Sequence, residues 1–189
     1  MRVTREKAAE NRAKIVATAS RLFREKGFDG VGLDAIMEEA GLTHGGFYRH
    51  FRSKDDLATE AVAYGLAASA QRQAAQTSLG GYVAGYLSAL HRDSRGTGCL
   101  LAGLGGDVAR HGTGPRQKLA AHVRGQIDRL AGWLGGRSAA ARREQAIATL
   151  SGLVGALVLA RAVDDSELSD EILASARAVF GGRTPGDER

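Results

Sequence analysis

Cysteine and proline are almost missing from this sequence of 189 residues. The single cysteine, Cys99, has no partner for an intrachain disulfide, and it excludes a structural zinc site built from several cysteines. Only Pro115 and Pro185 interrupt the chain, and long stretches without proline favour helices. Aromatic residues make up 5% of the chain, whereas alanine and glycine are abundant. These absences exclude a disulfide-stapled scaffold and favour a helical protein.

Long apolar segments are also lacking. The first seven residues are polar and charged, unlike the apolar core of a signal peptide. The longest uncharged apolar run covers residues 146–160, and a membrane-spanning helix needs about 20 residues. We therefore expect a cytoplasmic protein with no membrane partner.

Positive charge is concentrated near the N-terminus. Residues 1–54 contain 11 lysines and arginines against 7 acidic residues, which accounts for +4 of the net charge of +5. Clustered basic charge is typical of a protein that binds a polyanion such as DNA. A solvated basic face is the alternative explanation, and charge alone does not separate the two.

The spacing of apolar residues predicts an all-α protein with no strand and no internal repeat. Glycine-rich breaks and capping residues divide the chain into about nine helices. They are expected over residues 4–26, 33–40, 43–51, 53–76, 82–91, 100–110, 115–134, 139–162 and 170–180.

The second and third of these helices form the pattern of a helix-turn-helix. The turn is Ala40-Gly41-Leu42, in which Gly41 permits a positive φ. Such a turn places the following helix in the major groove of DNA, and Thr43 is expected to cap that helix. Residues 43–54 contain no acidic side chain. The helix expected over residues 43–51 contains two adjacent glycines, Gly45 and Gly46, and each destabilises a helix by about 1 kcal/mol relative to alanine. They indicate either that the backbone approaches DNA closely or that a short helix simply tolerates glycine.

Residues 14–57 resemble the TetR family of bacterial transcriptional regulators. The residues that carry the resemblance are Ile15, Ala19, Leu22-Phe23, Gly27-Phe28, Asp34-Ala35-Ile36, Ala40-Gly41-Leu42-Thr43, Gly46-Phe47-Tyr48-Arg49-His50-Phe51 and Ser53-Lys54-Asp55-Asp56-Leu57. The resemblance implies a DNA-binding domain over residues 1–52 and a ligand-binding and dimerisation domain over residues 53–189. It also implies that the protein is a regulator and not an enzyme.

By the same resemblance, Tyr48 and Lys54 contact phosphates, and Thr43, His44, Gly45 and Arg49 face bases or nearby phosphates. Lys54 begins a helix, where a bound anion would relieve the conflict between its charge and the helix dipole. Gly32 departs from the Ser or Thr that the family usually carries, so a phosphate contact there would come from backbone N–H alone. The predicted DNA-binding residues are Gly32, Thr43, His44, Gly45, Gly46, Tyr48, Arg49, His50 and Lys54.

A ridge of small side chains recurs every four residues along the helix expected over residues 139–162. Such a ridge permits close helix packing, either within the chain or between two chains. The family pattern implies a homodimer that reads a palindromic operator in double-stranded DNA. The predicted dimer interface is Ala148, Gly152, Ala156, Leu157, Ala160, Ile172 and Val179.

The central helices are expected to bind a small-molecule effector, and no cofactor or metal site is predicted. The candidate ligand-binding residues are Tyr64, Tyr86, Leu87, Cys99, Leu104, Val108, Ile127 and Trp133. Burial in an ordinary core is the alternative for each of them, and the identity of the effector stays open.

The function predicted first is a repressor that a small molecule releases from DNA, although nothing in the sequence separates repression from activation. A thiol-sensing regulator is an alternative, because Cys99 begins a helix, where the pKa of a thiol falls. A weaker alternative is a small helical enzyme that uses Cys99 or the pair Asp107 and His111. No nucleophile elbow or phosphate-binding loop supports an enzyme.

Overall fold

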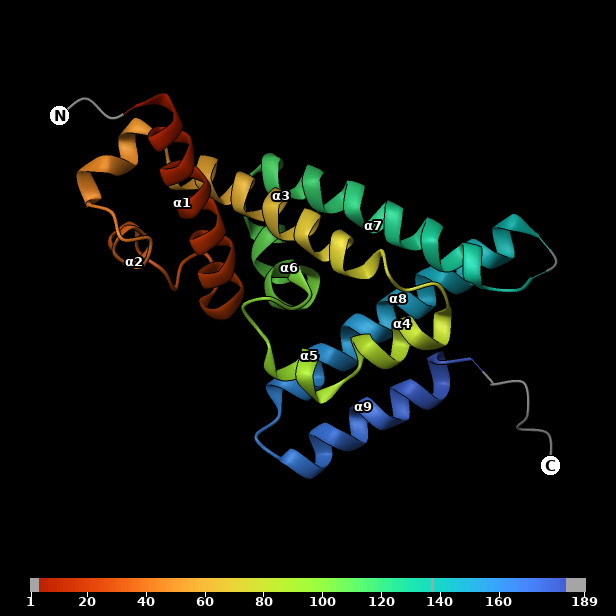
Figure 1. The fold of residues 1–189 in the computed structure, drawn as a ribbon. Helices are drawn as coiled ribbons and strands as arrows, with labels where there is room; N and C mark the ends of the chain where they lie inside the picture. The colour runs from red at the N-terminus through yellow and green to blue at the C-terminus, as the bar shows by residue number, and fades with distance from the viewer. Residues whose placement is uncertain (1–3, 137, 183–189) are drawn as a thin grey trace. The chain divides into compact units, whose positions relative to one another are not determined.

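The computed structural model describes residues 4–136 and 138–182, and every regular element within those ranges is a helix (Figure 1). The all-α fold predicted from the sequence is confirmed. The elements are α1 (Arg5–Lys26), α2 (Leu33–Glu39), the 3-10 helix η1 (His44–Arg49), α3 (Lys54–Gln73), α4 (Leu79–Tyr86), α5 (Ala89–Asp93), α6 (Leu100–Arg110), α7 (Thr113–Trp133), α8 (Ala139–Ala162) and α9 (Ser166–Phe180).

Side-chain caps set where several helices begin. Thr4, Ser138 and Asp165 precede α1, α8 and α9, and each accepts a hydrogen bond from the backbone N–H three residues later. The cap at Asp165 starts the last helix at Ser166, which is earlier than the predicted start at residue 170.

The single helix predicted over residues 82–91 is wrong, because the structure divides it. α4 ends at Tyr86, and the side chain of Ser88 then accepts a hydrogen bond from the N–H of His91 at 3.1 Å. This cap starts α5 at Ala89. The described residues therefore contain ten helical elements, one more than predicted.

Contacts divide the chain into two compact units, and the first comprises Met1–Ser69 and Gly96–Leu119. α1 supplies its central stripe, in which Ile15, Ala19 and Phe23 are completely buried. The same core contains buried side chains from each neighbouring element: Ile36 and Met37 of α2, Phe47 of η1, Leu57 and Val62 of α3, and Leu104 and Val108 of α6. The predicted functional boundary after residue 52 falls inside this unit.

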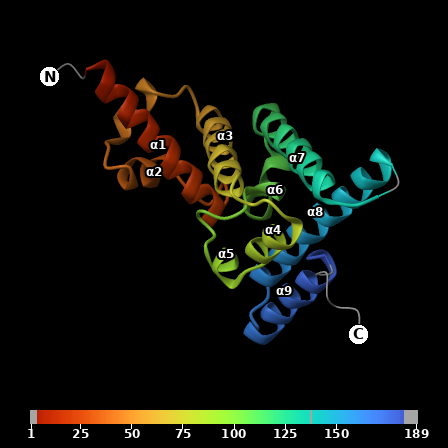
Figure 2. The same cartoon turned by 45° about the vertical axis from the view of Figure 1, so that its right-hand side comes forward.

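The second unit comprises Ala70–Arg95 and Ala120–Arg189. Its longest pair of helices is α8 and α9, which lie side by side and run in opposite directions (Figures 1 and 2). Leu157 of α8 and Leu173 of α9 are buried. The hydroxyl of Ser169 donates to the carbonyl of Ala160 at 2.7 Å and ties the two helices near the loop that joins them.

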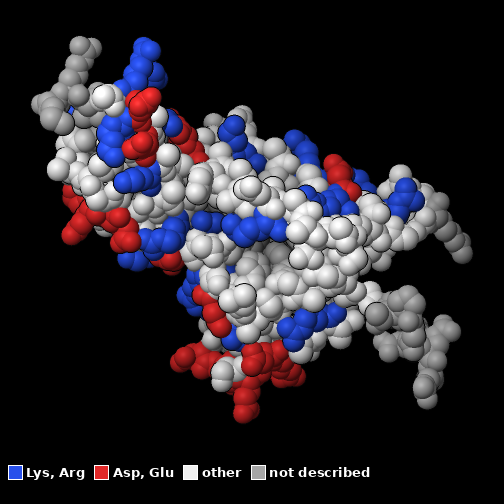
Figure 3. Space-filling view, viewed as in Figure 1, with Lys and Arg blue, Asp and Glu red and all other residues white. Residues whose placement is uncertain are grey.

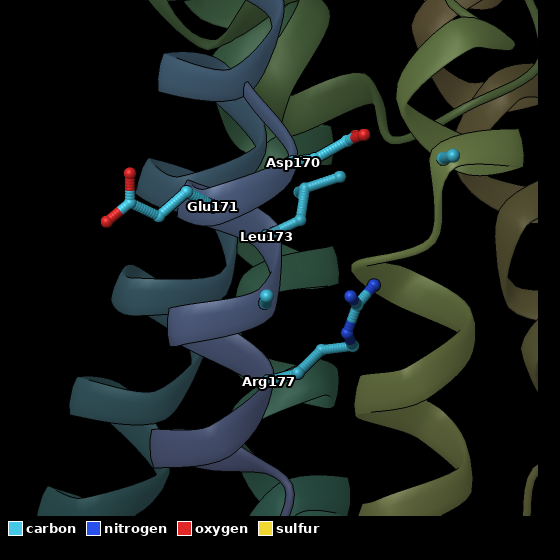
Figure 4. A pocket seen from close by; sticks show the side chains of 6 residues that line it. Asp170, Glu171, Leu173 and Arg177 are labelled. Atoms are coloured by element: carbon cyan, nitrogen blue, oxygen red, sulfur yellow. The ribbon is translucent and has the colours of Figure 1, made fainter. Parts of the chain in front are cut away.

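Arg177 of α9 joins the last helix to the segment before α5. Its guanidinium donates to the carbonyl of Leu87 at 2.6 Å. Figure 4 shows Asp170 and Arg177 pointing from α9 toward that segment, beside an open pocket of about 470 Å³, while Glu171 points away. Asp170 pairs with Arg92 at 2.6 Å, so both charged groups already have partners within the unit.

Acidic side chains gather where α9 begins (Figure 3). The group consists of Asp164, Asp165, Glu167, Asp170 and Glu171. Carboxylates are favoured at a helix N-terminus because the unsatisfied N–H groups carry positive partial charge. The helix dipole and the pair with Arg92 therefore account for this cluster.

α8 is longer and more apolar than the run of uncharged residues suggested. By length and composition alone, this 24-residue helix could cross a membrane, a test that the core helix of a soluble protein also passes. Leu153 and Leu157 on its inner face are completely buried within the second unit. This burial is what a core helix of a globular unit requires.

Candidate nucleic-acid interface

The turn between α2 and η1 has the geometry that the sequence predicts. Gly41 has a φ of +70°, which side chains with a Cβ rarely adopt. Its N–H donates to the carbonyl of Glu38 at 2.9 Å, and the N–H of Leu42 donates to the carbonyl of Met37 at 2.8 Å. These bonds close the end of α2 and direct the chain into η1.

The second helix of the pair is a 3-10 helix over His44–Arg49, shorter than the helix predicted over residues 43–51. The N–H of Gly46 donates to the carbonyl of Thr43 at 2.9 Å, an i to i−3 bond. Two adjacent glycines destabilise an α-helix by about 1 kcal/mol each relative to alanine, which favours a short, tighter turn. Thr43 stands at the N-cap position, but its side chain makes no capping hydrogen bond.

The outer face of η1 is open. With three residues per turn, Gly45 and Tyr48 lie one above the other, and Tyr48 is 65% exposed. Arg49 is exposed next to them. A Cβ at Gly45 would meet no atom within 4 Å, so no contact inside the chain requires glycine there. This open space is consistent with an approaching partner rather than with internal packing.

A carboxylate lies beside the outer face of η1, although residues 43–54 themselves contain no acidic side chain. The Nδ1 of His44 contacts the carboxylate of Asp34, which stands in the first turn of α2, and both side chains are exposed. The Asp34 carboxylate therefore places negative charge beside the hydrogen-bond donors of this face. Sequence reasoning placed Asp34 only at the α2 dipole and missed this contact.

Arg12 ties α1 to α3 and to the end of the helix-turn-helix. Its guanidinium donates two hydrogen bonds to the carboxylate of Glu60 on α3. The same guanidinium lies 4.7 Å from the centre of the Phe51 ring, which stacks on Phe47 at 5.5 Å. A bidentate ion pair and a cation–π contact together give η1 a defined position in the unit.

Two other predicted DNA-binding residues stand where helices begin. Gly32 is the exposed N-cap of α2 and has no capping side chain. Lys54 begins α3, and its Nζ donates to the carbonyl of Phe28 at 2.5 Å. None of the nine predicted DNA-binding residues is buried in the core; they are Gly32, Thr43, His44, Gly45, Gly46, Tyr48, Arg49, His50 and Lys54.

Comparison with known proteins agrees with this geometry. Residues 15–61 match the family model of bacterial regulatory proteins, tetR family. The matched segment contains the apolar stripe of α1, the whole helix-turn-helix and the start of α3. Over this segment the chain is similar to the tetR family of bacterial regulatory proteins.

The relatives are similar over different parts of the chain. An uncharacterised HTH-type transcriptional regulator of Bacillus subtilis, YxaF, is 45% identical over 56 residues, which cover 29% of this chain and 29% of that protein. The solved structure of Escherichia coli NemR in its reduced form is 25% identical, covers 90% of this chain and 95% of that one, and has a TM-score of 0.72. AibR, solved with isovaleryl coenzyme A and operator DNA, has the same fold at 15% identity, 92% and 100% coverage and a TM-score of 0.64.

The sequence similarity to HTH-type transcriptional regulators covers the N-terminal segment, and the chain spans less than a third of the length of the curated relatives it matches. The pair that suggested an enzyme has a structural role instead. Asp107 accepts a hydrogen bond from the N–H of Phe28 at 3.1 Å, and the ring of His111 packs edge-on against the Phe28 ring at 4.5 Å. Among the described residues, no group of three or more potential ligands could hold a metal ion.

The residues predicted for a TetR-family dimer interface divide into two groups. Leu157 and Ala160 are buried inside the second unit, and Ala156 is almost buried, so the ridge packs largely within its own chain. Phe180 covers Gly152, because its ring atoms lie 2.2 Å from where a Cβ would stand. The other predicted residues lie at least partly at the surface: Ala148, Ile172 and Val179.

The predicted effector-binding residues are divided between the two units. Leu104 and Val108 belong to the core of the first unit, as the simpler explanation requires, and Tyr64 on α3 is 47% exposed. Cys99 is buried at the N-cap of α6, and a buried thiol is typical of a packing residue. No observation therefore favours the thiol-sensing alternative.

The remaining candidates, Tyr86, Leu87, Ile127 and Trp133, belong to the second unit. Sequence reasoning missed Tyr82, whose ring lies 5.7 Å from those of Tyr86 and Trp133. The spacing of Tyr82 and Tyr86, four residues apart on α4, was the available signal.

Proposed function

We propose that this chain is a cytoplasmic transcriptional repressor that binds a palindromic operator as a homodimer and leaves it when a small molecule binds. The open face of η1 is the observation that carries the proposal. It presents an exposed tyrosine, an exposed arginine and a glycine with free space above it, Tyr48, Arg49 and Gly45. These groups suit contacts to phosphates and base edges in a major groove.

The homodimer is supported by an apolar groove on the outer face of α8 and α9. The groove has a volume of about 550 Å³, and Leu159, Ile172 and Val179 contribute to its lining. Leu159 is 56% exposed and Val179 is 73% exposed. A second copy of the chain would cover these side chains and bring a second recognition element to the other half of a palindrome.

The release by an effector is supported by the aromatic residues of the second unit. The hydroxyl of Tyr82 donates to the Oε1 of Gln126 at 3.5 Å, and Gln126 also donates to Gln73 at 2.6 Å. Aromatic faces around one buried amide suit a small, largely apolar molecule with a single polar group. AibR, with the same fold, has been solved with isovaleryl coenzyme A.

Selection of bound sequences from a random pool of duplex DNA tests the proposal. The expected product is a palindrome whose half-sites are about one helical turn apart, as a two-fold dimer requires. Arg49→Met is the control, since it should weaken binding and flatten its salt dependence. Placed over a promoter, the selected site should lower expression of a reporter gene. Recovery of no sequence, or of a site without two-fold symmetry, contradicts the proposal.

DNA affinity is expected to rise as the pH falls, because of His50. Burial lowers the pKa of His50, and the positive charges of Arg12 and Arg49 lower it further, so these surroundings favour the neutral ring in the free protein. A nearby phosphate would raise that pKa, so binding takes up a proton. We expect affinity to increase about threefold per subunit between about pH 7.5 and about pH 6.

The measurement is a binding titration across this pH range at constant ionic strength. His50→Gln should reduce the pH dependence of operator affinity. An unchanged profile in His50→Gln would exclude His50 from the DNA interface.

A further inference from the structure

Phe28 occupies the turn between α1 and α2, at a point where four parts of the first unit meet. Its side chain is buried and packs edge-on against Phe23 of α1 at 5.0 Å. The other side of the ring meets His111, the residue that follows α6, at 4.5 Å. The turn that leads into the helix-turn-helix is therefore held by aromatic contacts to both Phe23 and His111.

The backbone of Phe28 is held as firmly as its ring. Its N–H donates to the carboxylate of Asp107 on α6 at 3.1 Å, and its carbonyl accepts from the ammonium of Lys54 on α3 at 2.5 Å. Both hydrogen bonds are charge-assisted, which makes them stronger than bonds between neutral groups.

Gly27 shows how closely α6 approaches this turn. It has a φ of +77°, and a Cβ there would lie 2.7 Å from the Oδ2 of Asp107. The backbone conformation therefore favours glycine, and the carboxylate would have to shift to admit a Cβ. The same carboxylate also pairs with Arg110 at 2.5 Å, which fixes its orientation.

Lys54 thus has a partner that differs from the one its family resemblance implies. A cation in the first turn of a helix opposes the dipole, and a DNA phosphate would be one way to relieve that conflict. In this structure the Phe28 carbonyl supplies the negative partner from within the protein.

We propose that Phe28 is a joint that sets the position of the helix-turn-helix, and that Lys54 and Asp107 are the positioning residues that hold it. Lys54 then contributes to DNA binding through the Phe28 carbonyl and not through a phosphate. The proposal rests on the proposed function as a DNA-binding protein. It assigns a role in DNA affinity to Asp107, a residue outside the segment that matches the family.

The salt dependence of DNA binding separates positioning from phosphate contact. Lys54→Met keeps the length of the side chain but removes its charge and donor. We expect affinity for the selected operator to fall about tenfold, the equivalent of one charge-assisted hydrogen bond, with an unchanged slope of log affinity against log salt. Arg49→Met is the matched control and should reduce the slope by about 0.9 for each phosphate that the arginine neutralises. An equal reduction in slope for Lys54→Met overturns the proposal.

Two further variants test the joint itself. Lys54→Arg retains a charged donor and should recover much of the lost affinity. Asp107→Asn should also lower affinity, and in the double variant with Lys54→Met the two losses should not add, because both act through Phe28. Full additivity, or no rescue by arginine, contradicts a shared joint. Thermal unfolding of each variant confirms that the comparison is made on folded protein.

Nuclear magnetic resonance supplies a test that needs no DNA. In the full chain, the amide proton of Phe28 should shift upfield in Asp107→Asn, because a carboxylate acceptor is replaced by a neutral one. An unchanged Phe28 amide overturns the joint. If wild-type protein bound no selected DNA, the proposed function would fail, while this resonance would still decide whether Asp107 holds Phe28.

Discussion

Replacing Phe47 with alanine is expected to abolish DNA binding by destabilising the recognition element itself. The Phe47 side chain is completely buried and stacks on Phe51 at 5.5 Å. Truncating a buried phenylalanine costs about 3–5 kcal/mol, through lost transfer free energy and the cavity left behind. Domains are stable by only about 5–15 kcal/mol, so this change removes a large part of the total. Urea unfolding and operator titration should both show the loss.

The neighbouring residue provides a matched control. Tyr48 is also aromatic, but it is 65% exposed, so Tyr48→Ala should change the free energy of unfolding by about 0.5 kcal/mol or less. Tyr48→Ala should nevertheless weaken DNA binding, because it removes the aromatic side chain that stands on the outer face of η1. Phe47→Leu, which keeps most of the volume, should retain most of both properties. If Phe47→Ala unfolds at the same urea concentration as the wild type, the packing described for η1 is incorrect.

The helix-turn-helix was predictable because its signals are local in the sequence. Apolar spacing placed Ile15, Ala19 and Phe23 on one side of α1, and one glycine, Gly41, marked the turn. The helical type of η1 was not predictable in the same way. The periodicity of six residues does not distinguish an α-helix from a 3-10 helix, and only the cost of adjacent glycines pointed to the shorter form.

The contacts that position the site join residues far apart in the chain, and no local pattern encodes them. Arg12 and Glu60 are 48 residues apart, and Phe28 and Asp107 are 79 apart. The resemblance to a family covered Phe28 as a sequence position but gave no information on what it touches. Asp107 and His111 were noticed for their spacing, yet their partner Phe28 emerged only in three dimensions.

The ridge of small residues on α8 shows a different limit. The ridge predicted close helix packing within the chain or between two chains, and Ala156 and Ala160 are both buried. Their partner is α9 of the same chain, however, because a stripe of small side chains specifies a short distance between helices and not the identity of the second helix. The face of α8 and α9 that remains available for a second chain consists of larger apolar residues, among them Leu159 and Val179.

The second prediction with a large expected effect concerns Leu159 and Val179. Leu159→Glu combined with Val179→Glu should convert a dimer into a monomer, because four like charges would have to be buried in a symmetric interface. Operator affinity should then fall by at least about a hundredfold, since the second half-site would no longer bind at the high effective concentration that a linked partner provides. Sedimentation and operator titration measure the two effects on the same preparation.

Leu90→Glu is the control that isolates the groove from general surface charge. Leu90 lies on α5 in the same unit and is 79% exposed, more than either groove residue, but it does not line the groove. This variant should keep the oligomeric state and operator affinity of the wild type. Gly152 is unsuitable for such a test, because any larger side chain there would first displace Phe180 of its own chain. A wild-type monomer, or a dimer that survives both glutamates, would show that the groove is not the surface through which two copies associate.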